Sequence, residues 1–144
     1  MIQTDPIKQI KDNITHTVPE PMFNSSPELD PKGWGHEILI HNDTDYCGKI
    51  LHFKVGGESS VHFHQLKKET WYIHSGEFLV MWINLETGKL LSKNVVAGDI
   101  IDIPRYLPHR IHCLVEGDVF EVSTEHFYDD SYRVISGDSQ KKIN

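Results

Sequence analysis

The sequence predicts an all-β domain in which short strands form a sandwich or barrel. The chain from residue 35 onward consists of short runs rich in β-branched and aromatic residues. Turn-forming segments such as "NDTD", "GGESS" and "ETGK" separate these runs, and no stretch shows sustained helical periodicity. Short strands with frequent turn signals are typical of all-β sandwiches and barrels. A length of 144 residues suits a single domain with its own core.

The predicted elements fall into three segments along the chain. Residues 1–33 contain prolines at positions 6, 19, 21, 27 and 31, which interrupt any long helix or strand, so we expect an extended arm with one short helix at residues 5–13. Residues 34–128 hold the predicted strands, and residues 129–144 form a polar tail. The expected strands are residues 36–42, 46–55, 70–75, 77–85, 89–96, 99–104, 109–115 and 119–127.

Composition and charge argue against several classes of partner. The net charge of −7 disfavours nucleic acid, because phosphate neutralisation needs clustered lysine and arginine. The two lysine pairs, at 67–68 and 141–142, are expected on the solvated surface. No apolar run reaches the roughly 20 residues of a membrane helix, and the N-terminus lacks the apolar stretch of a secretory signal. Two cysteines make no disulfide framework, so we expect a cytoplasmic protein.

The segment "VHFHQLKKETW" contains the residues most typical of a metal site. Residues two apart on a strand point to the same side, so His62 and His64 project together. Glu69 directly precedes the predicted strand at residues 70–75, in phase with Trp71, and can face the two histidines across a hairpin. His109 opens a later strand. An isolated pair of this kind is also common on polar strand faces. Three neutral imidazoles and one carboxylate, however, suit a divalent transition metal such as Zn, Mn, Fe, Ni or Co. The histidines that fall out of phase, and are not expected to bind metal, are His52, His74 and His112.

The spacing of these residues strengthens the metal interpretation. They lie in the strings G-x5-H-x-H-x4-E-x6-G, from Gly56 to Gly76, and G-x5-P-x4-H, from Gly98 to His109. The two strings resemble the two motifs of the cupin superfamily, whose three histidines and one glutamate bind a metal inside a small jelly-roll barrel. The resemblance implies a cupin jelly roll here, with the four residues named above as its metal ligands.

A narrower resemblance extends over the segment from Trp34 to Arg133. This segment is similar to the C-terminal cupin domain of type II mannose-6-phosphate isomerases. The similar elements are "KGWGHE", "YCGKILHFKVG", "ETWYIHSG", "PHRI", "FEV" and the late "DDSYR". The resemblance implies a sugar or sugar-phosphate isomerase or epimerase.

Five further residues are candidates for catalysis or substrate binding. Lys49 falls on the apolar face of its strand, where it either lines a wet cavity as a base or phosphate ligand, or reaches solvent from the strand end. Arg110 belongs to the isomerase motif, but strict alternation turns it away from a pocket that its neighbouring histidine faces, so it ranks below Lys49. Trp71 is either part of the core or a sugar-stacking wall. Tyr106 stands where the cupin motif has a glycine and could cap the pocket mouth, and Glu121 is either outward or a pocket carboxylate.

These features predict a metal-dependent isomerase or epimerase that acts on a small sugar or sugar phosphate. Two alternatives use the same residues, namely an Fe(II)-dependent dioxygenase and a non-catalytic protein that binds a sugar or nucleotide sugar. Neither nucleic acid nor a membrane is an expected partner. A homodimer is expected, because the edges of a β-sandwich need covering and the arm could add a strand to a neighbour.

Overall fold

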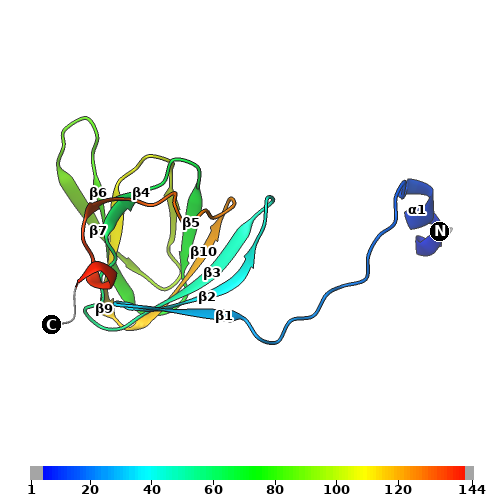
Figure 1. Cartoon of the computed structure of the whole chain (residues 1–144), viewed down its shortest axis with the longest axis horizontal. Coiled ribbons are helices and arrows are strands. Elements are labelled where there is room, and N and C mark those ends of the chain that lie inside the picture. Colours follow the sequence, from blue (N-terminus) through cyan, green and yellow to red (C-terminus); the bar gives the residue numbers. More distant parts are fainter. Residues whose placement is uncertain (1–4, 142–144) are drawn as a thin grey trace.

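The structure is a computed structural model that describes residues 5–141 (Figure 1). Two antiparallel sheets pack as a β-sandwich, which confirms the predicted all-β fold. The first sheet has the strand order β1-β2-β3-β10-β5-β8. Its strands are β1 (Glu28–Lys32), β2 (Gly35–Asn42), β3 (Cys47–Phe53), β10 (Gly117–Ser123), β5 (Glu69–Ile73) and β8 (Ile100–Ile103). The second sheet has the order β11-β4-β9-β6-β7. Its strands are β11 (Tyr132–Ile135), β4 (Val61–Phe63), β9 (His109–Val115), β6 (Glu77–Ile83) and β7 (Leu90–Val96).

Side-chain alternation decides which residues point between the two sheets. In β3 every second residue is buried, and Lys49 is one of them although the others are apolar or a cysteine. The neighbouring strand β10 places Glu121 opposite Lys49, and on its other side opposite Trp71 of β5. Two charged side chains therefore enter the interior side by side, which indicates a polar cavity next to the apolar core.

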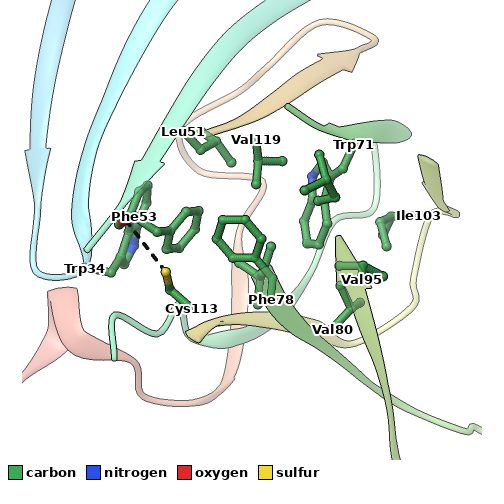
Figure 2. Close-up of a cluster of buried hydrophobic side chains, with 12 residues drawn as sticks. Trp34, Leu51, Phe53, Trp71, Phe78, Val80, Val95, Ile103, Cys113 and Val119 are labelled. Atoms are coloured by element: carbon green, nitrogen blue, oxygen red, sulfur yellow. Dashed lines mark hydrogen bonds between the residues drawn. The ribbon is translucent and has the colours of Figure 1, made fainter. Parts of the chain in front are cut away.

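The apolar core fills the space between the sheets beside this cavity (Figure 2). The rings of Trp34 and Phe53 are stacked with centroids 4.1 Å apart, and Phe53 meets Phe78 edge to face at 5.6 Å. The thiol of Cys113 donates to the Phe53 carbonyl oxygen at 3.7 Å, and burial raises the pKa of this thiol to about 11. Cys113 therefore stays protonated and packs as a small core residue.

The N-terminal arm extends away from the sandwich (Figure 1). Its helix, α1 (Pro6–Asn13), confirms the short helix that the sequence predicts. Proline stands in the first turn, where a missing N–H costs nothing, and the Asp5 carboxylate accepts a hydrogen bond from the Ile7 N–H at the N-cap. The end of the predicted arm differs from expectation, because residues 28–32 form β1 and pair with β2. Pro31 is tolerated there because β1 is an edge strand. An edge strand has no neighbour on its open side, so a missing N–H on that side removes no hydrogen bond between strands.

The predicted polar tail is also part of the sandwich. Tyr132 and Ile135 bound the strand β11, which pairs with β4, and a short 3-10 helix η1 (Asp138–Gln140) follows. The Asp138 N–H donates to the Glu58 carbonyl at 3.0 Å, and the Glu58 N–H donates to the Asp138 carboxylate at 2.8 Å. Gly137 lies so close to the backbone of residues 59–60 that a Cβ would overlap it, so the close approach requires glycine. The polar composition hid these contacts, because they are made mainly by backbone groups.

Residues 5–141 contain no helix with the length and apolar character needed to cross a bilayer.

Candidate metal centre

Three histidines from two neighbouring strands meet between the sheets. His62 lies in β4 and pairs in register with His109 at the start of β9, while His64 follows the end of β4. The ring centroid of His62 is 4.7 Å from that of His109 and 4.9 Å from that of His64. One ligand nitrogen from each ring lies within 4.8 Å of the other two. The structure thus brings together three of the four residues that the sequence singled out as ligands.

The hydrogen bonds of these rings leave one nitrogen of each free for a metal. The Nδ1 atoms lie 3.0 Å from the Ser60 carbonyl for His62, 2.7 Å from the Asp130 carbonyl for His64 and 2.7 Å from the Leu107 carbonyl for His109. A carbonyl oxygen only accepts, so each Nδ1 carries the proton and each Nε2 keeps its lone pair. The Nε2 atoms of His64 and His109 are buried and have no hydrogen-bond partner. This arrangement, in which backbone groups orient metal-binding imidazoles, is the one that metal sites use.

The surroundings keep the imidazoles of His62 and His64 neutral. Burial, followed by repulsion from His109 and His64, lowers the pKa of His62 to about 3. Burial, followed by the positive charge of Lys67, lowers the pKa of His64. Neutral imidazole is the form that binds a metal ion, so the cluster is ready for a cation at neutral pH.

Glu69, the fourth predicted ligand, adjoins the cluster and is almost completely buried. Its Oε1 lies 2.9 Å from Nε2 of His109, and its Oε2 lies 3.8 Å from Nε2 of His64. Burial by itself would raise the pKa of Glu69, but the positive charge of Lys67 outweighs it and holds the pKa well below its usual range. An ionised carboxylate facing a lone pair at 2.9 Å calls for a positive charge between them, which a divalent cation would provide. The donor set therefore fits a metal ion.

Lys67 is the main departure from the sequence-based expectation, which placed it on the solvated surface. It is 4% exposed, and its Nζ lies 2.8 Å from Glu69 Oε2 and 3.2 Å from Glu121 Oε2. Burial opposes its charge, but Glu121 and Glu69 raise its pKa, so the ammonium stays charged. The surface prediction was wrong because a lysine pair was judged by its charge alone. Lys67 lies in the loop between β4 and β5, so no strand alternation indicates its direction, and only its distant partner Glu121 explains its burial.

A cavity of about 170 Å³ opens beside the cluster. Glu121 lines it and is 5% exposed; burial and the charge of Glu69 raise its pKa to about 7, although Lys67 and Lys49 oppose the shift. Lys49 also lines the cavity, with Nζ 3.2 Å from Glu37 Oε2. The sequence left open whether Lys49 and Glu121 face a pocket or the solvent. In the structure both side chains line the cavity.

Similarity to known proteins is detectable in structure alone. No protein-family model matches the sequence, and no curated protein matches it. Oxalate decarboxylase from Bacillus subtilis, a protein with Mn(II) centres, superposes with a TM-score of 0.70 at 19% identity over 83% of this chain and 34% of its own. An RmlC-like cupin from Shewanella frigidimarina superposes with a TM-score of 0.63 at 23% identity over 75% of this chain and 92% of its own. The capsular polysaccharide assembling protein CapF from Staphylococcus aureus superposes with a TM-score of 0.67 at 18% identity over 78% of this chain and 34% of its own.

The chain has the cupin fold. It spans about a third of the oxalate decarboxylase and CapF chains and nearly all of the Shewanella cupin. The fold likeness does not bear on the narrower resemblance to mannose-6-phosphate isomerases, which stays a prediction.

Within this fold Trp71 belongs to both the core and the site. It is 3% exposed and packs in the apolar cluster, but it also lines the cavity, with its ring centroid 5.4 Å from that of His109. Its indole N–H is buried without a hydrogen-bond partner. Trp71 is therefore a core residue that also borders the cavity, and its role as a sugar-stacking wall stays a prediction.

The structure does not bring Arg110 and Tyr106 into the cavity. Arg110 points to the other side of β9, as alternation predicts, where its guanidinium contacts the Glu58 carboxylate at 3.0 Å and donates to the Ser136 carbonyl at 3.0 Å. Arg110 thus holds the C-terminal segment onto the sandwich. Because its guanidinium is engaged in these contacts outside the cavity, its position does not support a catalytic role. Tyr106 has a positive φ of 68°, which explains why a glycine suits this place, and its side chain is 56% exposed outside the cavity lining.

The remaining histidines near the motif lie away from the cluster, as expected. The His52 ring contacts the Asp118 carboxylate at 2.7 Å, and the His112 ring lies 3.2 Å from the Glu58 carboxylate. His74 is exposed and stacks on Phe120 with centroids 4.9 Å apart. Sequence reasoning missed one cavity histidine, His126, whose pKa is lowered to about 3 by burial and by Lys49 and Lys67.

Proposed function

We propose that this cupin is a metal-dependent enzyme that isomerises or epimerises a sugar or a sugar phosphate. His62, His64 and His109 would hold a divalent Zn, Mn, Fe, Ni or Co ion, with Glu69 as a further ligand. When bound, the cation would polarise a carbonyl or hydroxyl group of the substrate and stabilise the negative charge that develops on it. The observation that carries the proposal is a cavity beside the histidine cluster whose wall also contains a carboxylate, Glu121, that is not one of the ligands.

The chemistry of both reactions requires a side chain that takes a proton from carbon and returns it. Glu121 is the best placed, because it is buried in the cavity wall and Lys67 holds its carboxylate at 3.2 Å. Lys49, held by Glu37, is placed to donate a hydrogen bond to a substrate oxygen. Trp71 forms an apolar wall with a free N–H, a combination that suits the mixed surface of a sugar ring. CapF, a fold neighbour, is a capsular polysaccharide assembling protein, which agrees with a carbohydrate substrate.

The test is proton exchange at carbon in D2O. The untagged protein is analysed for bound metal, loaded in turn with each candidate ion and incubated with a panel of aldoses, ketoses and their phosphates. Nuclear magnetic resonance then detects deuterium next to the carbonyl carbon. We expect exchange with wild type and a loss of about 100- to 10,000-fold for Glu121→Gln, the range for one general base. Glu116→Gln, at an exposed carboxylate, is the matched control and keeps full exchange.

The alternative functions give different results in the same experiment. Oxygen consumption with Fe(II), without deuterium exchange, would replace the isomerase by a dioxygenase. Saturable sugar binding that Glu121→Gln does not change, with no exchange under any metal, would make the protein a binding module. A protein that holds no metal and is unaffected by chelation would remove the basis of the proposal.

A further inference from the structure

The cavity opens to the surface through a mouth built by β1 and by the C-terminal elements β11 and η1. Lys32 of β1, Arg133 of β11, and Ser139 and Gln140 of η1 line both the inner cavity and a wider outer hollow. Residues that border both spaces frame the passage between them. The mouth therefore consists of segments that the sequence assigned to an arm and a tail.

Arg133 points toward the metal side of this mouth. It pairs in register with His62, whereas the preceding residue, Tyr132, stacks on Phe63 with centroids 5.2 Å apart. Since neighbouring residues of a strand point to opposite sides, Tyr132 and Phe63 share the outer face, and Arg133 shares the inner face with His62.

Arg133 differs from every other cation near the site because its charge is not neutralised. Lys49 pairs with Glu37, Lys67 with Glu69 and Glu121, and Lys32 with Asp30 at 2.7 Å. Arg110 pairs with Glu58. Within residues 5–141, Arg133 has no ion-pair partner, although the protein as a whole carries a net charge of −7. An unpaired guanidinium at a cavity mouth in an acidic protein is suited to an anionic ligand group.

We propose that Arg133 and Lys32 form a phosphate subsite at the mouth, which rests on the proposed function and makes a sugar phosphate, rather than a free sugar, the substrate. The guanidinium binds two phosphate oxygens, and the Lys32 ammonium, although paired with Asp30 at 2.7 Å, lines the same mouth and has further N–H groups to donate. The Ser139 hydroxyl accepts a hydrogen bond from the Gly33 N–H at 3.1 Å, which leaves its O–H free to donate to a third oxygen. A forked guanidinium with ammonium and hydroxyl donors beside it matches a phosphate with three oxygens better than a carboxylate with two. The phosphate thus stays at the mouth while the sugar carbons reach Glu121.

Binding of inorganic phosphate and of phosphorylated sugars tests this subsite. The full-length protein as purified is titrated with inorganic phosphate, acetate and a hexose phosphate in an isothermal calorimeter at low salt. We expect phosphate to bind, and Arg133→Gln to weaken both phosphate and hexose phosphate about 10- to 100-fold, as expected for losing a charge-assisted pair. Arg105→Gln is the matched control, because this exposed arginine lies outside the cavity and donates only to the Leu66 carbonyl. Free hexose should bind equally to wild type and to Arg133→Gln.

Each other result contradicts the subsite. Equal phosphate affinity of Arg133→Gln and wild type would show that the anion binds elsewhere, and acetate binding as tight as phosphate would replace the phosphate by a carboxylate. The subsite and the proposed function fail separately. Arg133-dependent phosphate binding without deuterium exchange keeps the subsite and removes the isomerase, whereas exchange on free sugars that Arg133→Gln leaves unchanged keeps the isomerase and removes the subsite.

Discussion

Replacing Lys67 by methionine removes the buried positive charge that lies between two carboxylates. Its Nζ is 2.8 Å from Glu69 and 3.2 Å from Glu121, and the three side chains are 4%, 2% and 6% exposed. Methionine fills a similar volume without charge, so the substitution tests the charge rather than the packing.

The expected loss of stability is large and depends on pH. Breaking a buried ion pair by removing one partner costs about 3–5 kcal/mol of unfolding free energy. Glu121 already has a raised pKa of about 7, so it can take up a proton and limit the loss at low pH. An acid whose pKa is raised in the folded state destabilises that state as the pH climbs above its unfolded value. The loss in Lys67→Met should therefore be greater at pH 8 than at pH 6.

Urea denaturation followed by tryptophan fluorescence measures this loss, with and without added Mn²⁺ or Zn²⁺. A metal that binds only the folded protein stabilises it in proportion to the logarithm of its concentration over its dissociation constant. Because a cation beside Glu69 restores part of the missing positive charge, the metal should stabilise Lys67→Met more than wild type. Lys68→Met is the control, since this exposed neighbour should change stability by less than about 0.5 kcal/mol.

Two results would refute this reasoning. If Lys67→Met lost no more stability than Lys68→Met, the buried ammonium would not be holding the carboxylates together. If metal stabilised both proteins equally, Lys67 and the cation would not share Glu69.

Two further predictions concern the arm and the acid limit of stability. Deleting residues 1–27 should leave the sandwich folded, because β1 begins at Glu28, and should reduce the predicted dimer to a monomer in light scattering, since Met22 and Phe23 are 98% and 94% exposed on the arm; an unchanged particle mass would exclude the arm from the interface. The pKa of His126 is lowered from 6.5 to about 3, so the unfolded chain binds a proton between these pH values while the folded protein does not, and stability falls as the pH drops through this window. His126→Gln should reduce this loss of stability in acid denaturation. His74→Gln, at an exposed position, is the control and should behave like wild type. If stability fell equally with pH in all three proteins, the partly buried His126 imidazole would not be kept neutral by the fold.

The sequence by itself indicated most of the strands and the pairing of His62 with His64, because both depend on short-range order. Alternation along β4 is enough to set His62 and His64 on one face, and the same rule correctly turned Arg110 away from His109. The motif spacing then indicated which later histidine would join them. Alternation can be recognised in a few consecutive residues, so it predicts side-chain directions without any knowledge of which strands are neighbours.

Only the tertiary structure decided what surrounds the cluster. Lys67 is buried because β10 brings Glu121 to it across 54 residues, and no local pattern encodes that partner. The edge strands β1 and β11 were assigned to an arm and a tail, because their pairing energy comes from backbone groups on distant strands rather than from an apolar pattern of their own. Arg133 reaches the mouth of the cavity for the same reason. Which charges are neutralised, and which one is left for a ligand, depends on long-range proximity, and this is the property that a linear pattern of residues does not contain.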